Sequence, residues 1–306
     1  MKTMTIGGME ASQVSLGCMR LKSVSAGEAE ALIKTALDHG INYFDHADCY
    51  GDGLSEEIFS QAVDLRSSLR QQMLIQTKCG IRNDGVSRYD FSKEHILESV
   101  DGSLRRLKTD YLDALLLHRP DPLVEPEEVA EAFERLHAAG KVRYFGVSNQ
   151  SPMLIELLQK YIRQPLLINQ LQFSVCHALM LDQEIHFNMD TPFSPDRSGE
   201  IIEYCRLKDI TIQAWSPFQY GFFEGVFVDN PKFPELNQVL GRIAQEHNTN
   251  KSAVAVAWIL RHPAHMQVIV GTMNAKRLSD ISQATDFTLT REEWYEIYAA
   301  AGKQIP

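Results

Sequence analysis

Four polar residues stand at or just beyond the ends of apolar stretches, and their side chains are suited to moving a proton. The stretch 73–77, for example, ends at Lys78, and the stretch 114–117 ends at His118. In a chain of alternating strands and helices, polar groups that follow the strands converge on one face of a parallel barrel. We therefore expect a carboxylate, a phenol, an amine and an imidazole to meet at one site: Asp45, Tyr50, Lys78 and His118.

The chemistry that suits these four groups is the delivery of a proton to a developing alkoxide. A tyrosine phenol has a reference pKa of about 10 and is a weak acid near neutral pH. An ammonium such as Lys78 beside Tyr50 would stabilise the phenolate and make the phenol a better proton donor. Asp45 would hold the ammonium in place, and His118 would orient a carbonyl or relay a proton. Such a set fits the reduction of a carbonyl by hydride.

The elements that must position these residues alternate between strand and helix patterns. Eight predicted strands are each followed by a predicted helix, which is typical of a parallel sheet covered by helices. Eight such units form an α/β fold, the (β/α)8 TIM barrel, and we expect one domain over residues 1–306. Two three-layer domains are the alternative, but no Gly-, Pro- or Ser-rich linker marks a boundary. The predicted strands cover 14–17, 41–44, 73–77, 114–117, 142–147, 166–171, 210–215 and 267–270, and the helices cover 27–39, 55–69, 92–107, 127–139, a segment from 151, 198–207, 234–247 and 275–284.

Several segments fall outside this ring of eight units. Residues 3–6 and 13–14 suit an N-terminal β-hairpin that caps the barrel floor. The stretch 173–197 is too long for an ordinary connection and is expected to be a loop at the barrel mouth. Residues 251–261 and 290–301 are expected to be extra C-terminal helices, the second opened by a capping box.

Composition and charge limit the partners of the chain. It has 306 residues, 44% of them hydrophobic and 23% charged, and a formal net charge of −10. The negative charge argues against a nucleic-acid partner, although a local site could still bind an anionic cofactor. No apolar run reaches the roughly 18 residues of a membrane span, and the N-terminus lacks a signal-peptide pattern. We therefore expect a cytoplasmic protein with no membrane partner.

The five cysteines are scattered singly and form no CxxC pair, which is typical of reduced thiols in the cytoplasm. Cys49 and Cys79 lie next to Tyr50 and Lys78. We interpret them as small residues that pack at a crowded barrel mouth rather than as a redox switch. His46, Asp48 and Cys49 look superficially like metal ligands. No second set of ligands accompanies them, so we expect no metal.

Four short motifs lie in register with the predicted strands. They are Gly-Ile-Asn-Tyr-Phe-Asp at 40–45 followed by Tyr50-Gly51, Lys-Cys-Gly at 78–80, Leu-His-Arg-Pro at 117–120 and Gly-Val-Ser-Asn at 146–149. In this order they resemble the motifs of the aldo-keto reductase family, and the similarity spans nearly the whole chain. The run His-Arg-Pro-Asp-Pro at 118–122 is similar to that of small bacterial oxidoreductases of this family.

The resemblance implies a catalytic tetrad of Asp45, Tyr50, Lys78 and His118, with Tyr50 as the proton donor to the substrate carbonyl. It also implies NADP(H) bound across the barrel mouth, with NAD as a possible substitute. The cofactor contacts that it implies are Ser148, Asn149 and Gln170 at the carboxamide, Trp215 under the nicotinamide ring, Ser216, Pro217 and Phe218 along the pyrophosphate, and Gly271, Thr272 and Arg277 at the 2′-phosphate.

Two positions depart from the family pattern. Gly271-Thr272 stands where many members have Lys-Ser, so one phosphate-binding cation is missing and the preference for NADP over NAD is open. His46 stands where threonine is common. Competing interpretations remain for two residues, because Trp215 could pack inside the barrel and Arg277 could be an ordinary surface residue.

The function expected from these observations is the NAD(P)H-dependent reduction of a small aldehyde or ketone. The chain is expected to act as a monomer, with a homo-oligomer left open. A non-catalytic, nicotinamide-sensing interaction protein on the same barrel is the alternative from another class. A metal-dependent hydrolase would need a ligand set that the sequence lacks.

Substrate selection is expected to reside in the mouth loops 18–20, 173–197 and 219–230. Met19 and Arg20, together with Tyr50 and His118, are the predicted substrate contacts. The third loop is rich in aromatic residues, which would either line an apolar channel or pack the loop itself: Tyr220, Phe222, Phe223 and Phe227.

Overall fold

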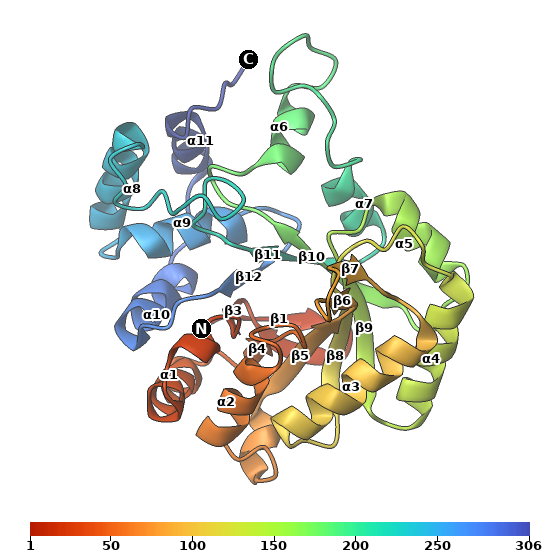
Figure 1. The fold of residues 1–306 in the computed structure, drawn as a ribbon. Coiled ribbons are helices and arrows are strands. Elements are labelled where there is room, and N and C mark those ends of the chain that lie inside the picture. The colour runs from red at the N-terminus through yellow and green to blue at the C-terminus, as the bar shows by residue number, and fades with distance from the viewer.

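The centre of the molecule is a closed barrel of eight parallel strands, drawn in Figure 1, and the computed structural model describes all residues from Met1 to Pro306. Each strand pairs with the next one along the chain, and β12 closes the ring onto β3. The predicted (β/α)8 barrel is therefore confirmed. The strands are β3 (Val14–Gly17), β4 (Tyr43–Asp45), β5 (Leu74–Cys79), β8 (Leu112–Leu117), β9 (Val142–Ser148), β10 (Leu166–Gln172), β11 (Thr211–Trp215) and β12 (Gln267–Val270).

Helices cover the outside of the barrel, and several begin at side chains that satisfy free backbone N–H groups. Ser25 and Glu28 form a capping box at the first helix, and the Ser151 hydroxyl accepts from Leu154 N just before Pro152. The covering helices are α1 (Ala26–Asp38), α2 (Leu54–Ala62), α3 (Lys93–Leu107), α4 (Pro126–Ala138), α5 (Pro152–Gln159), α7 (Ile201–Leu207), α9 (Lys251–Leu260) and α10 (Ala275–Ser282). None of the helices is both long enough and apolar enough to cross a bilayer.

The helix that covers the barrel after β11 is α9, whereas the sequence favoured residues 234–247. Residues 253–259 of α9 are all buried, because this helix is apolar on every side and contacts β12. The preceding helix, α8 (Pro234–Glu246), buries only one stripe and packs on α9 from outside. The amphipathic pattern of α8 is thus typical of an outer layer. The last helix, α11 (Arg291–Ala300), also packs on α8 and opens with the predicted capping box.

An antiparallel hairpin closes the barrel floor, as expected, but its second strand lies earlier than predicted. It pairs β1 (Thr3–Ile6) with β2 (Met9–Ser12). Ile6, Met9 and Ala11 pack against buried side chains of the barrel strands, including Tyr43 and Leu116. A second hairpin, β6 (Ile81–Arg82) and β7 (Arg88–Tyr89), extends β5 and was not predicted.

The long segment after β10 is a mouth loop that contains a short helix, α6 (Leu179–Ile185). Figure 1 shows α6 beside α11 and the C-terminus. The carboxylate of Asp182 accepts hydrogen bonds from the Tyr298 hydroxyl at 2.9 Å and from Lys303 Nζ at 2.6 Å. These contacts tie the mouth loop to the end of the chain.

Candidate active site

Lys78 lies at the centre of the polar cluster that the sequence predicts. It comes from β5 and its side chain has no exposed surface. Its Nζ is 2.8 Å from the Asp45 carboxylate at the end of β4, and it donates to the Tyr50 hydroxyl at 3.1 Å. It also donates to the main-chain oxygen of His46 at 2.7 Å. These three acceptors use all three protons of the ammonium.

The electrostatic environment keeps Lys78 charged and Tyr50 protonated. Burial alone lowers the pKa of Lys78, but the Asp45 carboxylate and the Tyr50 hydroxyl outweigh it, so the pKa is raised above its ordinary value. Burial raises the pKa of Tyr50 to about 12, although Lys78 acts in the opposite direction. Lys78 thus stabilises the phenolate as expected, while the buried setting of the free protein holds the proton on the phenol.

His118 completes the cluster from the end of β8. Its ring centroid lies 5.8 Å from that of Tyr50, edge to face. Burial, together with Lys78 and Arg119, lowers the pKa of His118 well below its usual value, so the imidazole is neutral. Its Nδ1 lies 3.6 Å from the Cys49 sulfur, and burial raises the pKa of that thiol to about 12. A protonated thiol next to Nδ1 favours the tautomer that carries its proton on Nε2.

A chain of buried glutamines supports Asp45 from below, and the sequence did not predict it. Gln76 Nε2 donates to Asp45 Oδ1 at 2.6 Å, and Gln170 Nε2 donates to the same oxygen at 3.0 Å. Both glutamines also donate to Gln213 Oε1. The chain continues through Gln267 to the main chain at the barrel floor. The only sign of this network in the sequence is that each of these glutamines lies within a predicted strand whose side chains fill the barrel.

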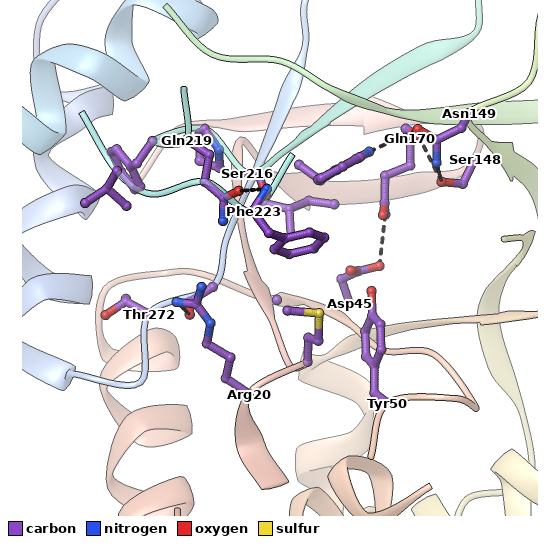
Figure 2. A pocket seen from close by; sticks show the side chains of 18 of the residues that line it. Arg20, Asp45, Tyr50, Ser148, Asn149, Gln170, Ser216, Gln219, Phe223 and Thr272 are labelled. Atoms are coloured by element: carbon purple, nitrogen blue, oxygen red, sulfur yellow. Dashed lines mark hydrogen bonds between the residues drawn. The ribbon is translucent and has the colours of Figure 1, made fainter. Parts of the chain in front are cut away.

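One cavity of about 210 Å³ at the barrel mouth joins the predicted catalytic, substrate and cofactor residues. Figure 2 shows Asp45 and Tyr50 on one side of it, Gln170, Ser148 and Asn149 on another, and Arg20 with Thr272 on a third. Lys78 is the only predicted site residue outside its lining, because it is buried behind Tyr50 and Asp45. The predicted residues on its wall are Met19, Arg20, Asp45, Tyr50, His118, Ser148, Asn149, Gln170, Trp215, Ser216, Pro217, Phe218, Gly271, Thr272 and Arg277.

The cavity wall formed by β9, β10 and β11 is organised by hydrogen bonds. Asn149 Nδ2 donates to Ser148 Oγ at 2.8 Å, and Trp215 Nε1 donates to Asn149 Oδ1 at 3.3 Å. The indole is therefore held at the cavity rather than packed inside the barrel. The amide nitrogen of Gln170 is used by Asp45 and Gln213, which leaves its Oε1 as an acceptor. An aromatic face beside amide and hydroxyl groups fits a planar ring that carries a carboxamide.

The opposite end of the cavity lies at the N-terminus of α10. Asn274 caps this helix by accepting from Arg277 N at 2.8 Å, and Arg277 itself is exposed. A Cβ added at Gly271 would meet nothing within 4 Å, so the chain leaves open space there. A free guanidinium at a helix N-terminus is suited to a phosphate.

The aromatic residues of the loop after β11 divide into two groups. Phe227 is fully buried and packs the loop, whereas Phe222 and Phe223 are exposed at its tip. Phe223 lines the cavity and stacks on Trp215 with ring centroids 6.2 Å apart. Tyr220 donates its hydroxyl hydrogen bond to Glu224 O within the loop. Of the four aromatic side chains, Phe223 thus lies where a ligand of the cavity could meet it.

Comparisons with known proteins show the family of this chain. The model of the aldo/keto reductase family matches residues 4–301. The chain belongs to the aldo/keto reductase family. It is 37% identical to the uncharacterized oxidoreductase YcsN of Bacillus subtilis, with 97% of both chains covered, and 34% identical to a 6-dehydroglucose reductase of Agrobacterium fabrum, again with 97% of both covered.

The fold is also that of solved members of the family. An aldo/keto reductase from Klebsiella pneumoniae, in complex with NADP and acetate, superposes with a TM-score of 0.78 at 23% identity. The alignment covers 100% of this chain and 97% of that one. The family match and the bacterial oxidoreductases among the relatives identify this aldo/keto reductase as an oxidoreductase.

Proposed function

We propose that this aldo/keto reductase reduces aldehydes or ketones to alcohols with NADPH, and that Tyr50 donates the proton to the carbonyl oxygen. Members of the family use NAD(P)H, and the nicotinamide supplies the hydride when bound. The observation that carries the proposal is the Lys78–Tyr50 hydrogen bond of 3.1 Å at the wall of the cavity. It joins a phenol that faces the cavity to a buried cation.

Each member of the cluster has a distinct part in the proposed reaction. The Tyr50 hydroxyl loses its proton to the oxygen of the carbonyl, and Lys78 stabilises the phenolate that remains. Asp45 keeps Lys78 charged and in place through the 2.8 Å contact. Lys78 is thereby held in the correct position before any substrate binds, so little reorganisation accompanies the proton transfer.

The neutral His118 is proposed to orient the substrate. With Nδ1 facing the Cys49 thiol, Nε2 carries the proton and can donate a hydrogen bond to the carbonyl oxygen. Two donors, Tyr50 and His118, would then fix the position of that oxygen. Met19 and Arg20 line the same cavity and are proposed to contact the remainder of the substrate.

The cofactor contacts are proposed from the two ends of the cavity. Trp215 would stack on the nicotinamide, and Asn149, Ser148 and Gln170 Oε1 would hold its carboxamide. Ser216, Pro217, Phe218, Gly271 and Thr272 line the path between the two ends, and Arg277 would meet the 2′-phosphate.

All five cysteines are unpaired thiols, which suits the proposed cytoplasmic location. We also propose that the whole chain acts as one domain and as a monomer.

A turnover assay tests the proposal. We expect the protein to oxidise NADPH in the presence of 4-nitrobenzaldehyde, and Tyr50→Phe to lose nearly all of this activity while still binding NADPH. Tyr89→Phe is the matched control, since Tyr89 is exposed on the β6–β7 hairpin away from the cavity. Failure to bind any nicotinamide cofactor would contradict the proposal. Binding without turnover would instead favour the nicotinamide-sensing alternative.

A further inference from the structure

Arg119 is a cation at the cavity wall that the proposed reaction does not use. It follows His118 directly after β8 and lines the same cavity as Tyr50. Its side chain is half-buried, yet its guanidinium makes no ion pair and no hydrogen bond within the chain. The only carboxylate that lines the cavity, that of Asp45, is already paired with Lys78. The five N–H donors of Arg119 therefore have no partner in the protein.

Two aromatic rings fix the position of this guanidinium. Its central carbon lies 5.6 Å from the centre of the Trp215 ring and 5.9 Å from that of Phe222. Trp215 is in turn held by its hydrogen bond to Asn149. Cation–π contacts of this kind hold a guanidinium while leaving its N–H donors free in the plane of the group. Arg119 is thus a pre-positioned donor rather than a mobile surface side chain.

The three arginines of the cavity differ in position. Arg277 lies at the N-terminus of α10, and Arg20 donates to the main-chain oxygen of Gly271 at 3.4 Å, next to β12. Arg277 is thus assigned to the cofactor 2′-phosphate, and the guanidinium of Arg20 already has a main-chain partner. Arg119 stands on the His118 side, and it is one of the groups that lower the pKa of His118. In a protein with a net charge of −10, Arg119 is thus a cation without an ion-pair partner close to His118.

We propose that Arg119 binds a carboxylate of the substrate, so that the preferred substrates are carbonyl compounds that also carry a carboxylate group. This inference rests on the proposed function, because it concerns the occupant of the same cavity. The planar fork of an arginine matches the two oxygens of a carboxylate, and such charge-assisted hydrogen bonds are among the strongest in proteins. The exposed rings of Phe222 and Phe223 would contact the apolar part of the substrate. The expected aromatic channel is therefore amphipathic rather than purely apolar.

A pair of substrates of nearly equal shape tests this inference. The wild type, Arg119→Gln and Arg119→Lys are compared on 4-formylbenzoate and on its methyl ester, with NADPH. We expect the wild type to favour the carboxylate by roughly tenfold or more in kcat/KM, which is typical of one charge-assisted contact. In Arg119→Gln the ratio should fall to about 1, and Arg119→Lys should restore part of it. General damage to the site would lower both rates and leave the ratio unchanged.

The matched control is Arg163→Gln, which removes the same charge from a surface position with 85% of its side chain exposed. This variant should keep the wild-type ratio. The inference is overturned if the wild type shows no preference for the carboxylate, or if Arg119→Gln keeps the preference.

A binding measurement separates this inference from the proposed reaction. Calorimetric titration with 4-(hydroxymethyl)benzoate and with its methyl ester requires no turnover. Tighter binding of the carboxylate, lost in Arg119→Gln, supports the role of Arg119 even if no aldehyde is reduced. Reduction of both aldehydes at equal rates, with equal binding of both alcohols, leaves the proposed reaction intact and rejects the role of Arg119.

Discussion

Gln76 donates a hydrogen bond of 2.6 Å to Oδ1 of Asp45 inside the barrel, where neither side chain has appreciable contact with solvent. Gln76 and Lys78 are two residues apart on β5, so both point to the barrel interior. One binds Asp45 through an amide and the other through an ammonium. The carboxylate is therefore fixed from two directions, and its position determines where Lys78 meets Tyr50.

Replacing Gln76 by Met should loosen this support. The change removes one donor from Asp45 and leaves the Tyr43 hydroxyl, which donates to Gln76 Oε1 at 2.8 Å, without its acceptor. An unsatisfied buried polar group costs about 1–3 kcal/mol, so the free energy of unfolding should fall by that amount. We expect kcat/KM to fall as well, because Lys78 would be less well positioned. Chemical denaturation and steady-state kinetics measure the two effects.

The control for this variant is Gln71→Met, at an exposed position shortly before the same strand. It should change neither quantity appreciably. An unchanged unfolding free energy in Gln76→Met would show that the glutamine chain contributes nothing to the support of Asp45.

The positions of the four tetrad residues could be predicted because a barrel with parallel strands brings all strand ends to one face. That argument needs only the apolar stretches and the polar residue that follows each. It contains no information on which residues fill the barrel interior, so Gln76 and Gln213 were not predicted. The prediction also chose α8 instead of α9 as the helix that covers the barrel after β11, because the amphipathic pattern of α8 suits any helix with one buried face. Arg119 was overlooked because its significance depends on Trp215 and Phe222, which are distant in sequence.

The pH dependence of carbonyl reduction follows from two groups at the cavity. Burial raises the pKa of Tyr50 to about 12, so the donor stays protonated throughout the usual range. The pKa of His118 is lowered well below its usual value, so the imidazole stays neutral. We therefore expect kcat/KM for reduction to be nearly constant from about pH 6 to pH 9, because neither group titrates there.

A pH–rate profile with a neutral aldehyde checks this expectation, and His118→Asn provides the comparison. A step near pH 6.5 in the wild type that vanishes in His118→Asn would contradict it. Such a step would show that the imidazole of His118 gains a proton in the free enzyme within this pH range.

Arg277 should determine the choice between the two nicotinamide cofactors. Only NADPH carries the 2′-phosphate, and Arg277 is a free cation at the N-terminus of α10, whereas the neighbouring Lys276 is paired with Asp280 at 2.7 Å. We expect Arg277→Ala to raise KM for NADPH by roughly tenfold, as suits the loss of one charge-assisted contact, and to change KM for NADH little. Arg66→Ala, at an exposed position remote from the cavity, is the control. An equal rise in KM for NADPH and NADH would indicate that Arg277 contacts a part of the cofactor that both share.

The stability of the protein should depend on pH through Asp48, which lies between Asp45 and Tyr50 in the sequence. Burial, aided by the nearby Glu56 carboxylate, raises the pKa of Asp48 to about 7, and Ser99 and Arg106 offset this only in part. In the unfolded chain the carboxyl titrates near its ordinary value of about 4. Between about pH 4 and pH 7 the native state therefore holds a proton that the unfolded state has released. The contribution of Asp48 to the free energy of unfolding therefore falls as the pH rises through this window and stays level above it.

Asp48→Asn removes the titration, so the variant should become progressively more stable relative to the wild type between about pH 4 and pH 7. The difference should reach about 2–4 kcal/mol, since each pH unit of the window contributes about 1.4 kcal/mol and the site is not fully dry. Urea denaturation at several pH values measures it. Asp52→Asn, which removes a carboxylate from an exposed position of the same loop, is the control. A constant difference in Asp48→Asn would mean that Asp48 ionises in the native state as readily as in the unfolded chain.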